Sequence, residues 1–336
     1  MKKSERLLAE KFLMQRIFEE DPDFVDKTME AFDISRSTVY NYITRLQEQG
    51  ELERVGGSMP YRILYQTARF TIDTSKEKSE DRVFARDIAP LLADLPFNAQ
   101  KIWRYAITAM LNNAMEHARA SAIVVVVSKS RLCTIVGVLD NGVGIFRRIQ
   151  QSYREEMGET LTTAEAASLL YTGKYTTAPD RHAGEGIFFT AHLMDNFAIR
   201  SDMQLFTLTD EEDAEGGERF RGTAVQMALA NDTERELADV MATYVDDEEG
   251  FIRTEIPMAR VFGGAIPMSR SEARRLGEML VGFREAVLDF TDMPEIGPDF
   301  AHELFGVITR ARGDLYLRTV HANDRVAAAI RRAERA

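Results

Sequence analysis

The sequence predicts a multidomain α+β protein, and three observations lead to this prediction. The chain has 336 residues, more than a single hydrophobic core usually organises. Two charged stretches, residues 71–82 and 246–250, interrupt it. Helical periodicity and strand-like apolar runs both occur on either side of these breaks. The expected domains are therefore 1–70, a linker over 71–81, a central domain over 82–232 and a C-terminal domain over 252–336.

The bulk composition is that of a globular protein in a reducing compartment. Hydrophobic residues make up 45% of the chain, and no segment approaches the length of a membrane span. The start, MKKSERLLAEKF, has no apolar run of the signal-peptide type. The single cysteine, Cys133, excludes an internal disulfide. We expect a cytoplasmic protein without a membrane partner, and the net charge of −12 means that any DNA contact must come from a local patch.

The first block predicts two helices followed by a strand pair. A helix is expected over 24–32, and a second helix carries Val39, Ile43 and Leu46 at helical spacing after a serine cap. Strands at 51–55 and 61–65 flank a Gly-Gly turn. This order resembles the winged helix-turn-helix of bacterial transcription regulators, and the resemblance implies a DNA-binding domain.

The local chemistry of the second helix favours the same interpretation. No acidic residue lies between residues 34 and 47, and hydroxyl and guanidinium groups can reach phosphates and base edges. The expected DNA-binding residues are Arg36, Ser37, Thr38, Tyr40, Asn41, Arg45 and Arg54, with Arg62 also on the wing. The alternative is a protein-docking or dimerising module, because residues 1–70 hold 11 basic and 12 acidic side chains, a net of −1.

Three motifs follow one another in the central block. A helix contains LNNAMEHA (111–118), an apolar strand runs into DNGVGI (140–145), and GEGIFF (184–189) opens another helix. Strands over 198–229 end with RGTAVQMAL. In this order, the motifs resemble the N box, the two glycine boxes and the closing Gly-Thr of the GHKL ATPase superfamily. That superfamily includes gyrase B, Hsp90, histidine kinases, MutL and the anti-sigma-factor serine kinases.

The resemblance implies an α/β sandwich that binds ATP or ADP with Mg²⁺. It assigns Asp140 to the adenine amino group, Thr223 to a supporting contact and Asn113 to magnesium. Glycines let the backbone pass close to a nucleotide, and helix N-termini hold phosphate oxygens. The expected nucleotide-binding residues are Asn113, Asp140, Gly142, Gly144, Lys174, Gly184, Gly186 and Thr223. Lys174 lies in a segment, 172–183, that fits a lid, and a solvated loop lysine is its alternative.

One position departs from the superfamily pattern. Many GHKL enzymes have a glutamate one helical turn before the N-box asparagine, and here that residue is Ala109. A methyl group cannot accept a proton, so the usual general base is missing. Glu116 points away from the face shared by Ala109, Asn113 and His117. We therefore expect nucleotide binding, and the sequence leaves hydrolysis open.

The third block predicts strand, helix, strand, loop and helix. A serine at 269 or 271 can cap an apolar helix, and the buried strand EAVLDFTDM follows. This order resembles the STAS fold of anti-anti-sigma proteins, and more closely a STAS-like domain. The loop PEIGPDF lacks the serine that STAS switch proteins phosphorylate, so a docking or dimerising surface is expected instead.

Three functions remain open from the sequence. The first is an ATP-gated transcription regulator that binds DNA through its N-terminal domain. The second is a serine kinase or ATPase of the anti-sigma type that acts on a separate protein partner. The third is an ATP-dependent homodimeric clamp on DNA.

Overall fold

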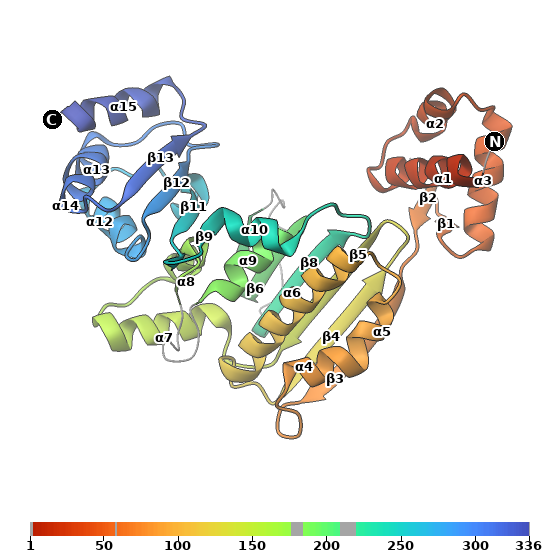
Figure 1. Cartoon of the computed structure of the whole chain (residues 1–336), viewed down its shortest axis with the longest axis horizontal. Coiled ribbons are helices and arrows are strands. Elements are labelled where there is room, and N and C mark those ends of the chain that lie inside the picture. The colour runs from red at the N-terminus through yellow and green to blue at the C-terminus, as the bar shows by residue number, and fades with distance from the viewer. Residues whose placement is uncertain (1–2, 58, 176–183, 209–219, 336) are drawn as a thin grey trace.

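The chain folds into three modules (Figure 1). Each has a hydrophobic core, and a fourth buried cluster joins Phe188 and Phe189 of the central module to Phe251 and Phe283. The computed structural model describes residues 3–57, 59–175, 184–208 and 220–335. Most of the expected lid at 172–183 lies outside the described residues. Mixed helices and sheets agree with the expected α+β class.

The N-terminal module, residues 3–65, packs three helices against a two-stranded ribbon. Ser35 caps the third helix by accepting a hydrogen bond from the Thr38 amide, as the sequence predicted for this position. The apolar residues of that helix, Val39, Ile43 and Leu46, are all buried. The elements are α1 (Lys3–Phe18), α2 (Phe24–Phe32), α3 (Arg36–Glu48), β1 (Leu52–Arg54) and β2 (Tyr61–Ile63).

A six-stranded sheet forms the centre of the molecule. Its strand order is β3-β4-β5-β8-β6-β7, and every neighbouring pair is antiparallel. Antiparallel strands with one wet face show alternating burial, and β4 and β5 do so along their length. The strands are β3 (Gln66–Asp73), β4 (Ala122–Lys129), β5 (Cys133–Asp140), β6 (Asn196–Asp202), β7 (Gln204–Thr207) and β8 (Phe220–Ala230).

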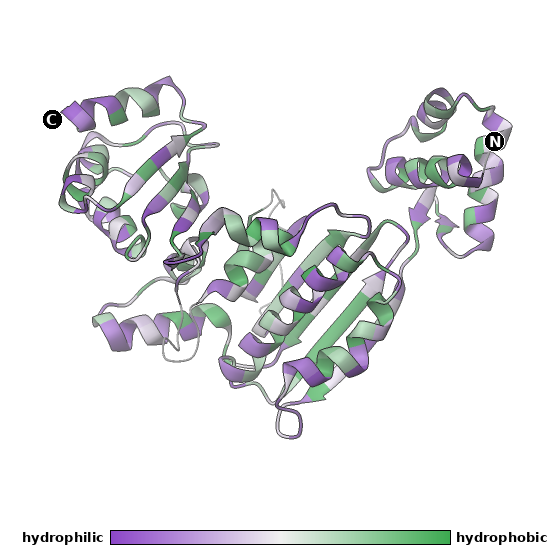
Figure 2. Cartoon of the chain, viewed as in Figure 1, coloured by the Kyte–Doolittle hydropathy of each residue, from purple (hydrophilic) through white to green (hydrophobic). Residues whose placement is uncertain are grey.

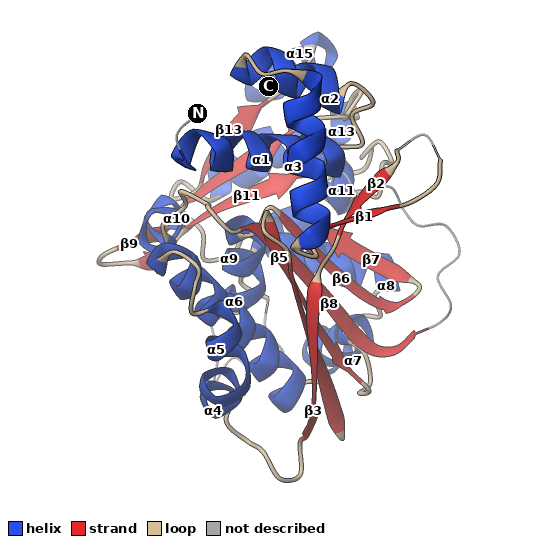
Figure 3. Ribbon diagram, turned by 90° about the vertical axis from the view of Figure 1, so that its right-hand side faces the viewer, coloured by secondary structure: helices blue, strands red, loops and turns tan. Residues whose placement is uncertain are grey.

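Helices cover one face of this sheet (Figure 3). The longest, α6, places Ile102, Trp103 and Ile107 in the central core, and its residues contact both β5 and α9. Figure 2 shows the apolar strands beneath these helices. The helical segments are α4 (Glu80–Val83), π-helical η1 (Phe84–Ile88), α5 (Ala89–Leu92), α6 (Phe97–Glu116), α7 (Ile145–Met157), α8 (Thr163–Ser168), η2 (Leu169–Thr172) and α9 (Glu185–Leu193).

The expected boundary between the first two domains is wrong in one respect. Residues 66–73 form β3, which pairs with β4 along its whole length as the edge strand of the central sheet. The expected linker over 71–81 therefore begins inside this strand. Its charged side chains misled the sequence analysis, because an edge strand with a solvated face tolerates polar residues.

The C-terminal module contains a parallel three-stranded sheet with the order β11-β12-β13. Ser269 caps α12 in a capping box with Glu272. A short helix and a hairpin connect this module to β8. The elements are α10 (Leu237–Tyr244), β9 (Val245–Asp246), β10 (Gly250–Phe251), β11 (Arg253–Pro257), α11 (Met258–Val261), α12 (Arg270–Met279), β12 (Glu285–Asp289), α13 (Pro298–Ala301), π-helical η3 (His302–Ile308), α14 (Thr309–Ala311), β13 (Tyr316–Val320) and α15 (Asp324–Arg335).

The turn between β4 and β5 belongs to the N-terminal core as well as to the central sheet. Leu132, at the tip of this turn, is 5% exposed and packs in the same cluster as Leu13, Met14 and Tyr42. The two modules therefore share a buried side chain. Their relative orientation is fixed by packing as well as by the connecting chain.

Truncation of Leu132 tests this shared core. We expect Leu132→Ala to destabilise the N-terminal module by about 2–5 kcal/mol, because it leaves a cavity there. The single tryptophan, Trp103, is fully buried in the central core and reports on that core alone. The circular dichroism signal of Leu132→Ala should fall at a lower urea concentration than the one at which its tryptophan fluorescence changes. Leu132→Met keeps the side-chain volume and should unfold as the wild type does. If the circular dichroism and fluorescence transitions of Leu132→Ala coincide and are not shifted from those of the wild type, the shared core is contradicted.

Candidate functional site

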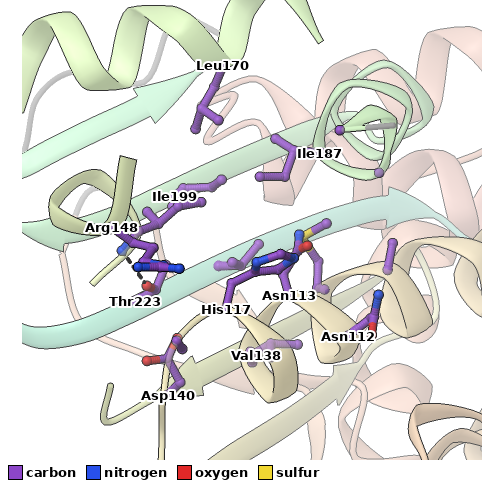
Figure 4. A pocket seen from close by; sticks show the side chains of 18 of the residues that line it. Asn112, Asn113, His117, Val138, Asp140, Arg148, Leu170, Ile187, Ile199 and Thr223 are labelled. Carbon is purple, nitrogen blue, oxygen red and sulfur yellow. Dashed lines mark hydrogen bonds between the residues drawn. The ribbon is translucent and has the colours of Figure 1, made fainter. Parts of the chain in front are cut away.

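A cavity of about 370 Å³ lies between the central sheet and helices α6, α7 and α9. This volume lies in the range typical of small-molecule sites. Apolar side chains such as Met110, Val138, Ile199 and Val225 form much of its wall (Figure 4). Six expected nucleotide-binding residues line it: Asn113, Asp140, Gly144, Gly184, Gly186 and Thr223. The structure thus brings together residues that are up to 110 positions apart in the sequence, from 113 to 223.

Asp140 is placed in the cavity by the alternation of β5. Buried and half-buried positions alternate along this strand, and Val136, Val138 and Asp140 all fall on the buried face. The carboxylate is therefore directed to the side of the sheet that the helices cover. It is 5% exposed, which is unusual for an aspartate that has no cationic partner among the described residues.

The surroundings of Asp140 raise the pKa of its carboxyl above the ordinary value. Burial is the largest cause, and hydrogen bonds from Gly142 and Thr223 partly oppose it. The Gly142 amide donates to Oδ1 at 2.7 Å. The Thr223 hydroxyl oxygen in turn accepts from the Ile145 amide at 3.0 Å, which ties the carboxylate to the start of α7. A desolvated acceptor of this kind suits a ligand that brings its own N–H donor.

Two glycines build the backbone around Asp140 and allow very close contacts. A Cβ on Gly222 would lie 2.0 Å from the Asp140 carbonyl oxygen, and its φ of +108° also favours glycine. A Cβ on Gly142 would lie 2.0 Å from the Ala118 carbonyl oxygen. Gly142 is not among the residues that line the cavity. Its observed role is to let the loop after β5 pack against the end of α6.

The first turn of α9 forms another part of the wall. Gly184 precedes the helix with φ of +81°, and no side chain in the described part of the chain caps the helix N-terminus. Its first amides can therefore hold an anion. Glu185 also lines the cavity, and burial raises the pKa of this carboxyl above its ordinary value.

The face of α6 expected to meet the nucleotide does line the cavity. Ala109, Asn113 and His117 are all lining residues, whereas the exposed Glu116 is not. A Cβ on Gly186 would lie 3.3 Å from that of Ala109, so the position of the missing glutamate is packed closely against α9. Asn112, which the sequence analysis did not single out, lines the cavity as well.

Arg148, on α7, is a cavity residue that the sequence analysis missed. It is the single lysine or arginine among the described residues that line the cavity. Its Nε atom is buried and has no hydrogen-bond partner within the described part of the chain. Figure 4 shows its side chain entering the cavity opposite Asn113 and His117. The helical spacing from Ile145 and from the buried Ser152 could have placed Arg148 on the inward face.

Lys174, expected at the phosphates, lies elsewhere. Its ammonium donates to the Gly282 carbonyl oxygen at 2.5 Å and lies 4.3 Å from the centre of the Phe283 ring. Burial lowers the pKa of this ammonium. Lys174 thus contacts the C-terminal module, and it does not line the cavity. The sequence could not show this, because the cation–π partner is more than 100 residues away.

Several of the expected DNA-binding residues are exposed, and several, including Ser37, make contacts within the module. Ser37, Tyr40, Asn41 and Arg54 are exposed. Arg36 is paired with Asp26, the hydroxyls of Ser37 and Thr38 are both within hydrogen-bond distance of the Ser35 hydroxyl, and Arg62 is paired with Glu53. Arg45 donates to Glu10 at 3.1 Å, a contact within the protein that the expected DNA role did not include.

Neither a metal cluster nor a membrane span is found in the described part of the chain. No group of three or more His, Cys, Asp or Glu side chains among these residues could hold a metal ion. No described helix is both long and apolar enough to cross a bilayer. Comparisons with models of known protein families and with curated proteins find no match for the chain.

Replacing Asp140 should reveal the cost of its burial. Because the folded pKa is raised above the ordinary value of 3.8, ionisation destabilises the fold. This penalty is fully present above the folded pKa and disappears as the pH falls below 3.8. Asp140→Asn, without nucleotide, should therefore melt higher than wild type at pH 7, and the difference should narrow towards pH 4. Asp292→Asn, at an exposed position, is the control. An Asp140→Asn variant that is less stable than the wild type at pH 7 would contradict a destabilising buried charge at Asp140.

Proposed function

We propose that the chain is an ATP-binding regulatory protein, in which the nucleotide state of a central GHKL-type domain controls DNA binding by an N-terminal winged helix. The observation that carries the proposal is the buried Asp140 carboxylate at the wall of an apolar cavity. An adenine amino group offers a further donor to this carboxylate, which already accepts from the Gly142 amide. Guanine carries a carbonyl oxygen at the same ring position, so the carboxylate would repel it.

The remaining cavity residues fit the rest of an adenine nucleotide. Arg148 brings a cation whose buried Nε has no hydrogen-bond partner among the described residues, and the start of α9 brings amides that no described side chain caps. Both groups suit phosphate oxygens. Asn113 offers a hard amide oxygen for Mg²⁺, which would neutralise the charge of the phosphates when bound. Either ATP or ADP is compatible with these groups.

The proposal is one of binding and sensing rather than of hydrolysis. Ala109 lines the cavity where the superfamily has its glutamate, and its methyl group cannot activate water. The carboxylates among the described lining residues are Asp140 and Glu185. Asp140 is committed to hydrogen bonds with its own loop. A protein that binds ATP without rapid turnover is suited to act as a switch.

DNA binding is supported by the exposed polar surface of α3. Tyr40 is 44% exposed, and Asn41 and Ser37 lie on the same helix with exposed side chains. A helix of this kind fits the major groove, and Asn can pair with adenine through two hydrogen bonds. Arg54, on the ribbon, can reach the backbone. The C-terminal module, which resembles a STAS-like domain, would supply a surface for a protein partner or a second copy.

The Asp140 carboxylate should contribute to the affinity for ATP. We expect Asp140→Asn to weaken a micromolar-range affinity by more than about tenfold, since the loss of a hydrogen bond to a charged group costs about 1.5–3 kcal/mol. Calorimetric titration of both proteins with Mg·ATP measures the change. The Asp292→Asn variant is the control. An unchanged affinity would remove Asp140 from the site.

Arg148 should distinguish nucleotides from nucleosides. Arg148→Met keeps an aliphatic side chain and removes the only lysine or arginine charge among the described lining residues, so ATP affinity should fall by about tenfold or more. Adenosine affinity should change less than twofold. The matched control is Arg147→Met, because Arg147 pairs with Asp202 outside the cavity. Equal losses for ATP and adenosine would show that Arg148 acts on the fold instead.

DNA recognition can be tested without a known operator. Wild-type protein should enrich a defined motif from a pool of random duplexes, with ATP and without it. Asn41→Ala should bind the enriched motif more weakly by about 1–3 kcal/mol, because a bidentate base contact is lost. Gln15→Ala, on α1 of the same module, is the control. Failure of the wild-type protein to enrich any motif would favour a protein-docking role for this module.

A further inference from the structure

A buried carboxylate joins three parts of the molecule. Glu10, on α1, is 2% exposed. Arg45 of helix α3 donates to its Oε1 atom at 3.1 Å, and Arg131 of the β4–β5 turn donates to Oε2 at 3.4 Å. Arg6 lies 3.7 Å from the same carboxylate. Arg131 also donates to Glu51 at 3.2 Å, so this turn holds both ends of the segment that contains α3.

The contact between Arg131 and Glu10 lies near one end of strands β5 and β8, and the proposed nucleotide cavity lies at their other end. β5 runs from Cys133, next to Leu132 in the N-terminal core, to Asp140 in the cavity. Its partner β8 carries Thr223 near one end and finishes at Ala230. Eight residues of strand span about 26 Å. Each strand therefore reaches from the proposed adenine site to the N-terminal module.

Hydrogen bonds hold these far ends together. The Asn231 side chain donates to the Ser130 carbonyl oxygen at 2.8 Å and accepts from the Thr134 hydroxyl at 2.7 Å. Next to it, Asp232 is paired with Lys11 of α1. The ends of β5 and β8 are thus one unit, and α1 contacts this unit through Lys11 as well as through Glu10.

We propose that Glu10 is a positioning residue that couples the nucleotide cavity to helix α3, an inference that rests on the proposed function. A buried carboxylate is costly unless it keeps its cationic partners. A shift of the β4–β5 turn therefore either moves Glu10 and Arg45 with Arg131 or deprives the buried Glu10 carboxylate of one of its cationic partners. Nucleotide contacts at Asp140 and Thr223 act on the other ends of the same strands. The orientation of α3 responds to the nucleotide through this path.

Hydrogen exchange measured on the full chain tests the coupling directly. In the wild type, saturating Mg·ATP should change the exchange rates of α3 amides, residues 36–48, by about fivefold or more, the lower end of usual coupling between sites. Arg131→Met keeps the aliphatic stem and loses the guanidinium. In this variant, the ATP-dependent change at α3 should fall below twofold, while ATP affinity stays within twofold of wild type.

The control and a second variant separate coupling from simple stability. Arg86→Met removes a surface arginine that pairs with Asp87 away from the N-terminal module, and it should keep the full ATP response. If Arg131 only stabilised the fold, Arg131→Met would change the exchange rates of the α3 amides by the same factor with and without ATP. If Arg131→Met does not fold, Glu51→Gln removes only the second partner of Arg131, and it should reduce the response partially.

The outcomes distinguish this inference from the proposed function. ATP binding with no change at α3 in the wild type would overturn the coupling and leave the nucleotide site intact. A full ATP response in Arg131→Met would also overturn it. No ATP binding by the wild type would overturn the proposed function itself, and the coupling with it.

Discussion

The account depends on one buried carboxylate at the end of a strand. Asp140 is kept out of water by helices α6, α7 and α9, and burial raises the pKa of its carboxyl. A buried carboxylate with a raised pKa at the wall of a cavity is a candidate for ligand binding, and this is the basis of the proposed nucleotide site. Gly142 and Gly222 let the backbone pack closely around Asp140, because any Cβ there would collide with neighbouring backbone.

The proposed coupling between the nucleotide cavity and the N-terminal module depends on the two strands that carry Asp140 and Thr223. β5 and β8 carry Asp140 and Thr223 at one end and contact the N-terminal module at the other. The C-terminal module approaches the cavity from another side, where Lys174 is held by Gly282 and Phe283. A nucleotide in the cavity would thus lie between two modules that can respond to it. We infer that the central domain acts as the sensor and the outer modules as its outputs.

The sequence predicted the parts of this arrangement that depend on local pattern. An apolar strand was expected to end at Asp140, helical spacing placed Ala109, Asn113 and His117 on one face, and serine caps marked the starts of α3 and α12. Contacts between distant segments could not be predicted in this way. Lys174 and Arg45 were assigned to ligands because their partners, Gly282 and Glu10, are remote in sequence. Arg148 was overlooked because an arginine in an amphipathic helix usually faces solvent.

Competition between ATP and inosine triphosphate tests the central claim most directly. The two nucleotides share their sugar and phosphates. At position 6 the amino donor of adenine is replaced by a carbonyl acceptor, and N1 changes from an acceptor to an N–H donor. The account predicts that the wild type binds inosine triphosphate more weakly by about 10- to 150-fold, the equivalent of about 1.5–3 kcal/mol for a charged hydrogen bond. Equal affinity for both nucleotides would show that Asp140 does not recognise the purine edge.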